Sequence, residues 1–174
     1  MIIEYIGAKM IILGFDPGYA IVGWGVIEKD SRGKCKVIDY GAITTPKEMR
    51  FPYRLEVIAD GVNALIDKFK PDAISVEELF FNTNITTGIM VAEARGVIIQ
   101  NAVKKVKALY EYTPLQIKQA LTGNGRAVKH QVQYMTMMML GLKSVPKPDD
   151  AADALAAALT HAQTNIRLVD SSMR

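Results

Sequence analysis

Two short apolar runs that each end in a carboxylate most restrict the fold of this chain. Residues 11–15 are followed by Asp16 and a Pro17–Gly18 turn, and residues 73–76 are followed by Glu77. Runs of this length, bounded by turn residues, are typical of buried strands. If the two strands are parallel neighbours in an α/β sheet, their carboxyl ends meet where such folds place their sites. We therefore expect Asp16 and Glu77 to lie together.

The remaining patterns predict one α/β domain with a mixed central β-sheet and helices on both faces. A polar loop containing Gly33 joins two β-rich segments into a hairpin, which with the first run makes a three-stranded meander. Thr113, Pro114 and Gln116 have the spacing of a capped helix start. The expected elements, in order, are strands at 11–15, 21–28 and 36–44, a helix at 52–69, a strand at 73–77, a helix at 86–105, a strand at 108–112, and helices from 114, 128 and 149.

Three aspartates begin the last expected helix, in the stretch PKPDDAADALAAALTH from Pro146. On a helix Asp153 shares a face with Asp150 (i, i+3) or with Asp149 (i, i+4), and the spacing does not choose between them. Asp149 could cap the helix while the other acids favour its positive end. Four apolar residues form a stripe that would hold this helix on a core: Ala152, Leu155, Ala156 and Leu159.

Carboxylates from two strand ends and one helix start would repel each other unless cations neutralised them. Their hard oxygen ligands suit Mg²⁺ or Mn²⁺. Two such ions about 3.5–4 Å apart can assist in-line hydrolysis of a phosphodiester. The two histidines, His130 and His161, are expected on a helix surface or in packing, so metal-assisted hydrolysis fits better than covalent catalysis.

Composition and charge limit the class of protein. The 174 residues, 49% of them hydrophobic, suffice for one domain, and no apolar run approaches the roughly 20 residues of a membrane span. The start lacks the features of a signal peptide, so we expect a cytoplasmic protein with no membrane partner. Cys35 is the only cysteine, which excludes an internal disulfide and argues against zinc.

The basic residues are concentrated in one segment. Residues 104–147 contain eight Lys or Arg and only one acid, Glu111, which gives +7 and leaves −4 for the rest of a chain of net charge +3. This division indicates a basic face for a polyanion beside an acidic pocket. Ordinary solvated helix faces are the alternative.

Five segments, in order and with matching gaps, resemble the bacterial RuvC family of Holliday junction endonucleases. They are GFDPG (14–18), VEELFF (76–81), EARG (93–96), YTPLQIKQALTGNGRA (112–127) and DDAADALA (149–156). The resemblance implies an RNase H-like fold. It also implies an endonuclease that resolves four-way junction DNA by paired symmetric nicks, in homologous recombination and DNA repair.

The resemblance also implies site residues, a cofactor and partners. It assigns Asp16, Glu77, Asp150 and Asp153 as catalytic metal ligands for Mg²⁺, with Mn²⁺ able to substitute and two ions per site, and leaves Asp149 as the cap. Phe80 matches an aromatic residue that wedges into the junction crossover. Lys118 and Lys129 match positions near the scissile phosphates, and Arg126 could join them.

The family acts as a homodimer, alongside the branch-migration proteins RuvA and RuvB. A stripe of small residues, Gly88, Ala92 and Gly96, resembles the dimer interface of the family, with packing inside the monomer as the alternative.

Two departures from the family pattern concern DNA contact. Val128 replaces an acid found in many relatives, and a Met-rich run replaces more basic surface. We interpret Met135–Met139 as adaptable core filling, with five side chains of this region facing inward: Val128, Val132, Met135, Met139 and Leu142. Residues 1–9 are expected to be an extension, 10–163 the nuclease domain and 164–174 a flexible tail.

Two other functions compete with a nuclease. An ATP-binding domain of the actin and sugar-kinase type also has an Asp–Gly turn after its first strand, but it needs two such lobes to enclose the nucleotide. A non-cutting junction-binding protein would gain only repulsion of phosphate from four acids.

Overall fold

The computed structural model describes residues 9–79 and 85–164. The elements along the chain are β1 (Met10–Asp16), β2 (Ile21–Lys29), β3 (Cys35–Thr44), α1 (Phe51–Phe69), β4 (Ala73–Glu77), α2 (Ile85–Lys105), β5 (Leu109–Tyr112), α3 (Pro114–Thr122), α4 (Lys129–Met139) and α5 (Asp149–Gln163). This order agrees with the one predicted from the sequence.

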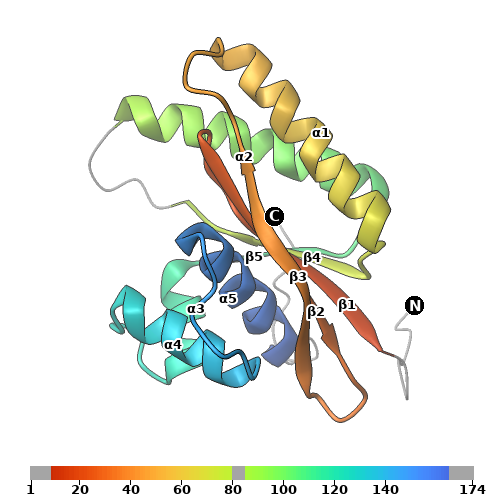
Figure 1. The fold of residues 1–174 in the computed structure, drawn as a ribbon, viewed down its shortest axis with the longest axis vertical. Coiled ribbons are helices and arrows are strands. Elements are labelled where there is room, and N and C mark those ends of the chain that lie inside the picture. The colour runs from red at the N-terminus through yellow and green to blue at the C-terminus, as the bar shows by residue number, and fades with distance from the viewer. Residues whose placement is uncertain (1–8, 80–84, 165–174) are drawn as a thin grey trace.

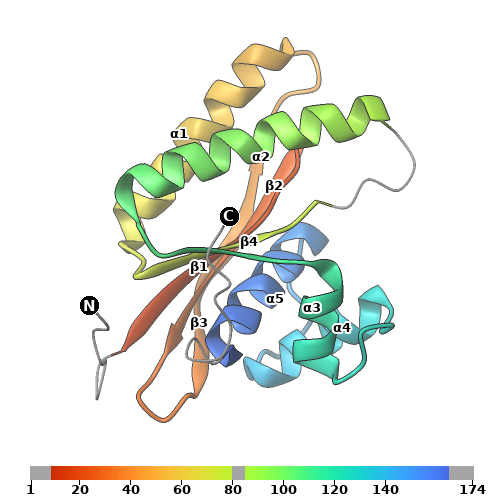
Figure 2. The ribbon, with the colours of Figure 1, turned by 180° about the vertical axis from the view of Figure 1, so that it is seen from behind.

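The five strands form one mixed sheet in the order β3-β2-β1-β4-β5. Strands β1 to β3 are an antiparallel meander, whereas β4 runs parallel to both β1 and β5. Helices α1 and α2 cover one face of the sheet, and α3, α4 and α5 cover the other (Figures 1 and 2). The predicted α/β class, with helices on both faces, is confirmed.

Each face of the sheet has its own apolar core, because side chains of a strand alternate between faces. Leu13 and Phe15 of β1 face the core shared with α1 and α2, while Ile12 faces the core shared with α3, α4 and α5. All three are fully buried. Strand β1 is thus fixed from both sides, which holds the residue at its end in place.

Helix α5 lies unusually close to the sheet. A Cβ atom at Gly14 would fall 2.1 Å from the carbonyl oxygen of Ala154, and one at Gly23 would fall 2.0 Å from that of Asp150. Only glycine therefore allows this approach. Ser75 of β4 adds a hydrogen bond from its Oγ to the carbonyl oxygen of Ala157, at 2.8 Å. The start of α5 is consequently held against the ends of β1 and β2.

The predicted apolar stripe of α5 is buried, but the burial extends much further around the helix. Ala151, Ala152 and every residue from 154 to 162 are buried. The helix therefore sits between the sheet and the α3–α4 pair, and small alanine side chains make this position possible.

Two predicted helix starts had different outcomes. At α3 the capping box is confirmed: Thr113 Oγ1 accepts from the N–H of Gln116, whose side chain accepts from the N–H of Thr113. At α5 the capping role of Asp149 is wrong, because Pro148 is the N-cap residue and Asp149 is already helical. The carboxylate of Asp149 instead pairs with the ammonium of Lys147, 2.6 Å away.

The expected inward side of α4 is only partly correct. Val132 is buried, but Val128 is 51% exposed, and Met138 and Met139 are 55% and 36% exposed. Helix α4 lies at the outside of its layer, so much of its surface meets solvent (Figure 1). Met138 and Met139 are therefore surface residues, whereas Met135 and Leu142 are partly buried and pack against the core, as expected. Among the described residues, no helix is long and apolar enough to span a membrane.

Candidate active site

Asp16 and Glu77 lie next to each other because their strands are parallel neighbours. Phe15 of β1 is in register with Val76 of β4, so the two acids are the next residues along adjacent strands. Both line a cavity of about 420 Å³. The juxtaposition predicted from the strand ends is confirmed.

The first turns of α5 bring two further acids toward this edge. Asp153 lines the same cavity as Asp16 and Glu77. Asp150 lies outside the cavity lining, but its charge acts on Asp16, and its backbone lies against Gly23, the β2 partner of Asp16. Asp149 is 47% exposed and pairs with Lys147. The local geometry therefore separates Asp149 from the other two aspartates.

Two lysines complete the polar part of the cavity. Lys118 of α3 and Lys129 of α4 both line it. The Nζ atom of Lys129 lies 2.7 Å from Oδ2 of Asp153, and its side chain is 59% exposed. This ion pair joins the start of α4 to the start of α5 and places a cation among the carboxylates.

The electrostatics of the cavity differ from those of ordinary surface acids. Burial raises the pKa of Asp16 well above its usual value, and Glu77, Asp153 and Asp150 raise it further, against the opposing charge of Lys129. Burial, followed by the charge of Asp153, raises the pKa of Glu77 to about 7. Such displaced values arise where like charges are held together away from water.

The same cavity that disfavours the charged forms of Asp16 and Glu77 favours the charged form of Lys129. Partial burial lowers the pKa of Lys129, but the hydrogen bond to Asp153 and the nearby carboxylate charges outweigh it, so the pKa is raised overall. The ammonium therefore remains charged at neutral pH. It partly neutralises an otherwise acidic cavity.

The carboxylates of the cavity are candidate metal ligands. No group of three or more His, Cys, Asp or Glu side chains in residues 9–79 and 85–164 is close enough, as the side chains stand, to hold a single ion. Lys129 occupies one oxygen of Asp153. The chemistry of the donors nevertheless fits a hard divalent cation, because Asp16, Glu77, Asp150 and Asp153 gather at one edge of the sheet, and Asp16 and Glu77 have raised pKa values.

Other predicted site residues are placed differently. Arg126 is exposed on the α3–α4 loop and is not part of the cavity lining. Phe80 lies outside the described residues. His161 is buried and its Nδ1 lies 2.8 Å from the hydroxyl of Tyr112, in agreement with the expected packing role. His130 is exposed, as expected for a helix surface.

Sequence reasoning missed the apolar wall of the cavity, which consists of Pro114, Ile117, Val132 and Ala156. Helical spacing could have indicated part of it. Val132 follows Lys129 by three residues, so the two lie on the same side of α4. Ile117 is adjacent to Lys118 in sequence, and adjacent residues of a helix do not share a face, so spacing gives no signal for Ile117. The ion pair between Lys129 and Asp153 joins residues 24 positions apart, and no local pattern predicts it.

The sheet order and the acidic cavity at the ends of β1 and β4 define the class of protein: an RNase H-like nuclease. Residues 12–161 match the family described as crossover junction endodeoxyribonuclease RuvC. This protein belongs to that family, whose nucleases depend on metal ions.

Relatives of similar length support the assignment. The RuvC protein of Alkaliphilus metalliredigens is 54% identical over 89% of this chain and 94% of its own length. The RuvC protein of Clostridioides difficile is 53% identical over 90% of this chain and 92% of its own length. The resemblance of the five sequence segments to RuvC is confirmed.

Two solved structures have the same architecture. Thermus thermophilus RuvC, solved in complex with a Holliday junction substrate, matches with a TM-score of 0.83 and 36% identity, over 88% of this chain and 93% of that one. The yeast mitochondrial Holliday junction resolvase Ydc2 matches with a TM-score of 0.64 and 14% identity, over 87% and 77% of the two chains. The latter likeness shows the fold alone.

Proposed function

We propose that this protein is a structure-selective endonuclease that resolves four-way DNA junctions by paired symmetric nicks. The observation that carries the proposal is one cavity in which Asp16, Glu77 and Asp153 lie beside Lys118 and Lys129, in a chain of the RuvC family. Acids suited to bind metal and lysines suited to bind phosphate are the two requirements of metal-assisted phosphodiester hydrolysis. Such an enzyme acts in homologous recombination and DNA repair, and thus in the cytoplasm beside the chromosome.

Asp16, Glu77, Asp150 and Asp153 would hold the metal, for which Mg²⁺ is the expected ion and Mn²⁺ a substitute, with two ions per site. Bound ions would supply Lewis-acid activation of water and stabilisation of the departing oxygen. Because burial and mutual repulsion raise the pKa values of Asp16 and Glu77, ionising both is costly without a cation. The protein therefore couples its charge state to metal binding.

The lysines have a role distinct from that of the acids. Lys118 and Lys129 approach the cavity from separate helices, so they can contact phosphate oxygens on either side of the scissile bond. The ammonium of Lys129 can exchange its partner from Asp153 to phosphate when DNA binds. We assign Arg126 to a more peripheral phosphate contact, because it lies on the adjoining loop.

Phe80 is proposed as the wedge that enters the junction crossover. This assignment rests on its match to the family motif and on its place three residues after Glu77. Insertion of an apolar ring between unstacked bases is an established way to distort DNA. In Phe80→Ala, cleavage of a junction should slow while stability is unchanged. A normal cleavage rate would assign the ring to core packing instead.

A homodimer is proposed through the outer face of α2. Ala94, Ile98 and Ala102 fill the inward face of this helix, whereas Ile89 is 55% exposed and Val103 is 41% exposed. Gly96 lies between them, and a Cβ atom there would meet no neighbouring atom within 4 Å. Packing inside the monomer therefore does not require this glycine.

A Gly96→Leu variant tests the dimer. It should shift the protein from dimer to monomer in analytical ultracentrifugation, without lowering the helical signal in circular dichroism. A variant that remained dimeric would exclude this face. Two sites related by two-fold symmetry suit a four-way junction, and RuvA and RuvB are the proposed protein partners on that junction.

An Asp16→Asn variant tests the catalytic assignment. It should bind a synthetic four-way junction as tightly as the unmodified protein but fail to cut it with magnesium. Asp39→Asn, on the distant β3 strand, is the matched control and should cut normally. Cleavage by Asp16→Asn would exclude the proposed site, whereas intact binding and no cleavage by the unmodified protein would favour a non-cutting junction binder.

A further inference from the structure

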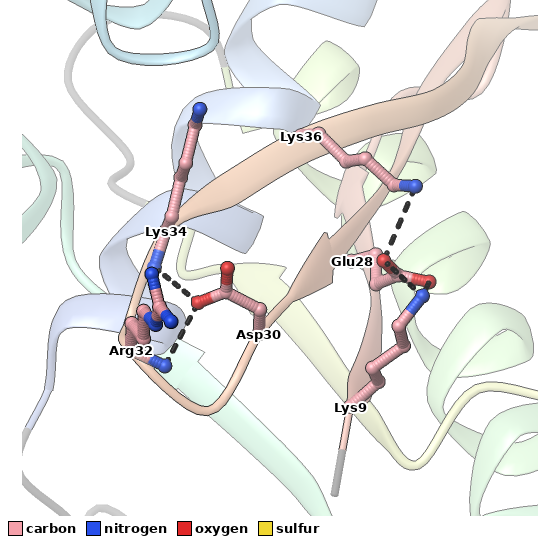
Figure 3. Close-up of polar contacts among 6 residues, drawn as sticks. All are labelled: Lys9, Glu28, Asp30, Arg32, Lys34 and Lys36. Carbon is pink, nitrogen blue, oxygen red and sulfur yellow. Dashed lines mark hydrogen bonds and ion pairs between the residues drawn. The ribbon is translucent and has the colours of Figure 1, made fainter.

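A second basic cluster lies at the β2–β3 hairpin, outside the acidic cavity. Residues 29–36 contain four basic side chains (Lys29, Arg32, Lys34 and Lys36) and one acid, Asp30. Lys9, just before β1, lies beside the same hairpin (Figure 3). This segment belongs to neither the catalytic residues nor the basic segment 104–147.

The acids of the hairpin are already engaged. Glu28 Oε1 lies 3.1 Å from the ammonium of Lys9 and 3.2 Å from that of Lys36. Asp30 Oδ1 accepts hydrogen bonds from the backbone N–H groups of Arg32 and Lys34, both at 2.9 Å (Figure 3). Asp30 therefore organises the turn through backbone groups. Its carboxylate is not an ion-pair partner for either side chain.

Arg32 and Lys34 are consequently free to bind an external anion. Both are exposed, and neither side chain has a hydrogen-bond or ion-pair partner in the described part of the chain. The turn that carries them is held by Asp30 and by the positive φ of Gly33, which is 83°. The two cations are therefore presented on an ordered hairpin tip.

The hairpin is connected to the catalytic cavity through α5. Lys29, at the end of β2, donates from its ammonium to the carbonyl oxygen of Ala162, near the end of α5. The catalytic aspartates occupy the opposite end of this 15-residue helix, which is about 22 Å long. The hairpin tip projects past the end of α5 (Figures 1 and 2). The helix thus sets the distance between the two charged regions.

On the basis of the proposed function, we propose that Arg32 and Lys34 bind backbone phosphates of the junction arm, about 6–9 base pairs from the cleaved bond. The length of α5, about 22 Å, and the hairpin tip beyond its end together separate the catalytic acids from Arg32 and Lys34 by about 22–30 Å. This distance corresponds to about 6–9 base pairs at 3.4 Å per phosphate along a strand. A tip with two unpaired cations and no apolar anchor suits a repeating phosphate backbone. An acidic protein surface would need anchoring contacts that the tip does not offer.

The test uses an Arg32→Gln, Lys34→Gln double variant and junctions with 15-base-pair arms. Three substrates are compared: an unmodified junction, one with neutral methylphosphonates at positions 6–9 of each arm, and one with them at positions 12–15. On the unmodified junction the variant should bind at least about tenfold more weakly at 0.1 M salt. The slope of the logarithm of the binding constant against the logarithm of the salt concentration, called the salt slope below, should fall in magnitude by about two for each hairpin that engages DNA.

The position of the neutral phosphates decides the outcome. With positions 6–9 neutral, the variant and the unmodified protein should bind equally, whereas with positions 12–15 neutral the difference should persist. A Lys68→Gln, Lys70→Gln double variant, at the exposed end of α1 on the other face of the sheet from α5, is the charge-matched control and should leave the slope unchanged. Cutting at saturating protein should be normal in the double variant.

Equal binding by both proteins to the unmodified junction would overturn the inference and leave an acidic protein as the partner of the tip. A defect that persisted with positions 6–9 neutral would also overturn it. Failure of the proposed function has a different signature, because the unmodified protein would then show no preference for any junction over linear duplex.

Discussion

Replacing Glu77 by Gln should stabilise the protein in the absence of metal. Burial and Asp153 raise the pKa of Glu77 from 4.5 to about 7 in the folded state. Between these values the folded protein binds more protons than the unfolded chain, so stability falls as pH rises and stays low above the folded pKa. At pH 8 the ionised Glu77 therefore lowers the free energy of unfolding by about 3 kcal/mol, at about 1.36 kcal/mol for each unit by which the pKa differs between the folded and unfolded states.

Urea unfolding in chelator measures this effect. Glu77→Gln should exceed the unmodified protein in free energy of unfolding by about 3 kcal/mol at pH 8, and by less than about 1 kcal/mol at pH 5, where Glu77 is protonated in the folded protein. Glu56→Gln, on the exposed face of α1, is the matched control and should change stability by less than about 0.5 kcal/mol. Added magnesium should stabilise the unmodified protein and not the Glu77 variant.

Two results would refute this reasoning. Equal stability of Glu77→Gln and the unmodified protein at pH 8 would show that Glu77 ionises without cost. An equal gain at both pH values would show a packing effect rather than the loss of a buried charge.

Three further predictions concern packing, a buried histidine and the cavity lysine. Gly14→Ala should lower the free energy of unfolding by at least about 2 kcal/mol, because the added Cβ would fall 2.1 Å from the carbonyl oxygen of Ala154. A decrease in this free energy of less than about 1 kcal/mol, measured by urea titration, would contradict the close approach of α5. Burial lowers the pKa of His161 to about 4, so the unfolded chain binds the extra proton and stability falls on acidification. Relative to His161→Gln, the unmodified protein should lose about 1 kcal/mol between pH 7.5 and 5.5, and parallel pH profiles of the two proteins would exclude this effect. Lys129→Gln should lower the free energy of unfolding by less than about 1 kcal/mol, since the Lys129 side chain is 59% exposed. The same change should reduce the salt slope of junction binding by about one for each site. An unchanged slope would remove Lys129 from the DNA contacts.

The sequence was most informative where a local pattern has one structural solution. The acid-ended runs at Asp16 and Glu77 met as expected, because parallel neighbours align their carboxyl ends. The capping box at Thr113 is equally local and was also predicted correctly. The choice of Asp150 over Asp149 came from family resemblance, since helical spacing permits both.

Errors arose where local side-chain competition or neighbours distant in sequence decide the outcome. Asp149 was expected to cap α5, but Pro148 takes that position and Lys147 pairs with the carboxylate. Val128 and Met138 were expected in the core, but periodicity does not reveal that α4 lies at the outside of its layer. Contacts between Lys129 and Asp153, or between Lys29 and Ala162, depend on the tertiary fold.

A nicking assay on a synthetic four-way junction, beside a linear duplex of the same sequence, tests the central claim most directly. With magnesium the protein should cut the junction at two symmetric positions in opposing strands and leave the linear duplex intact. Chelator should abolish cutting but leave junction binding in place. Equal cutting of junction and linear duplex, or cutting that persists in chelator, would contradict a metal-dependent junction resolvase.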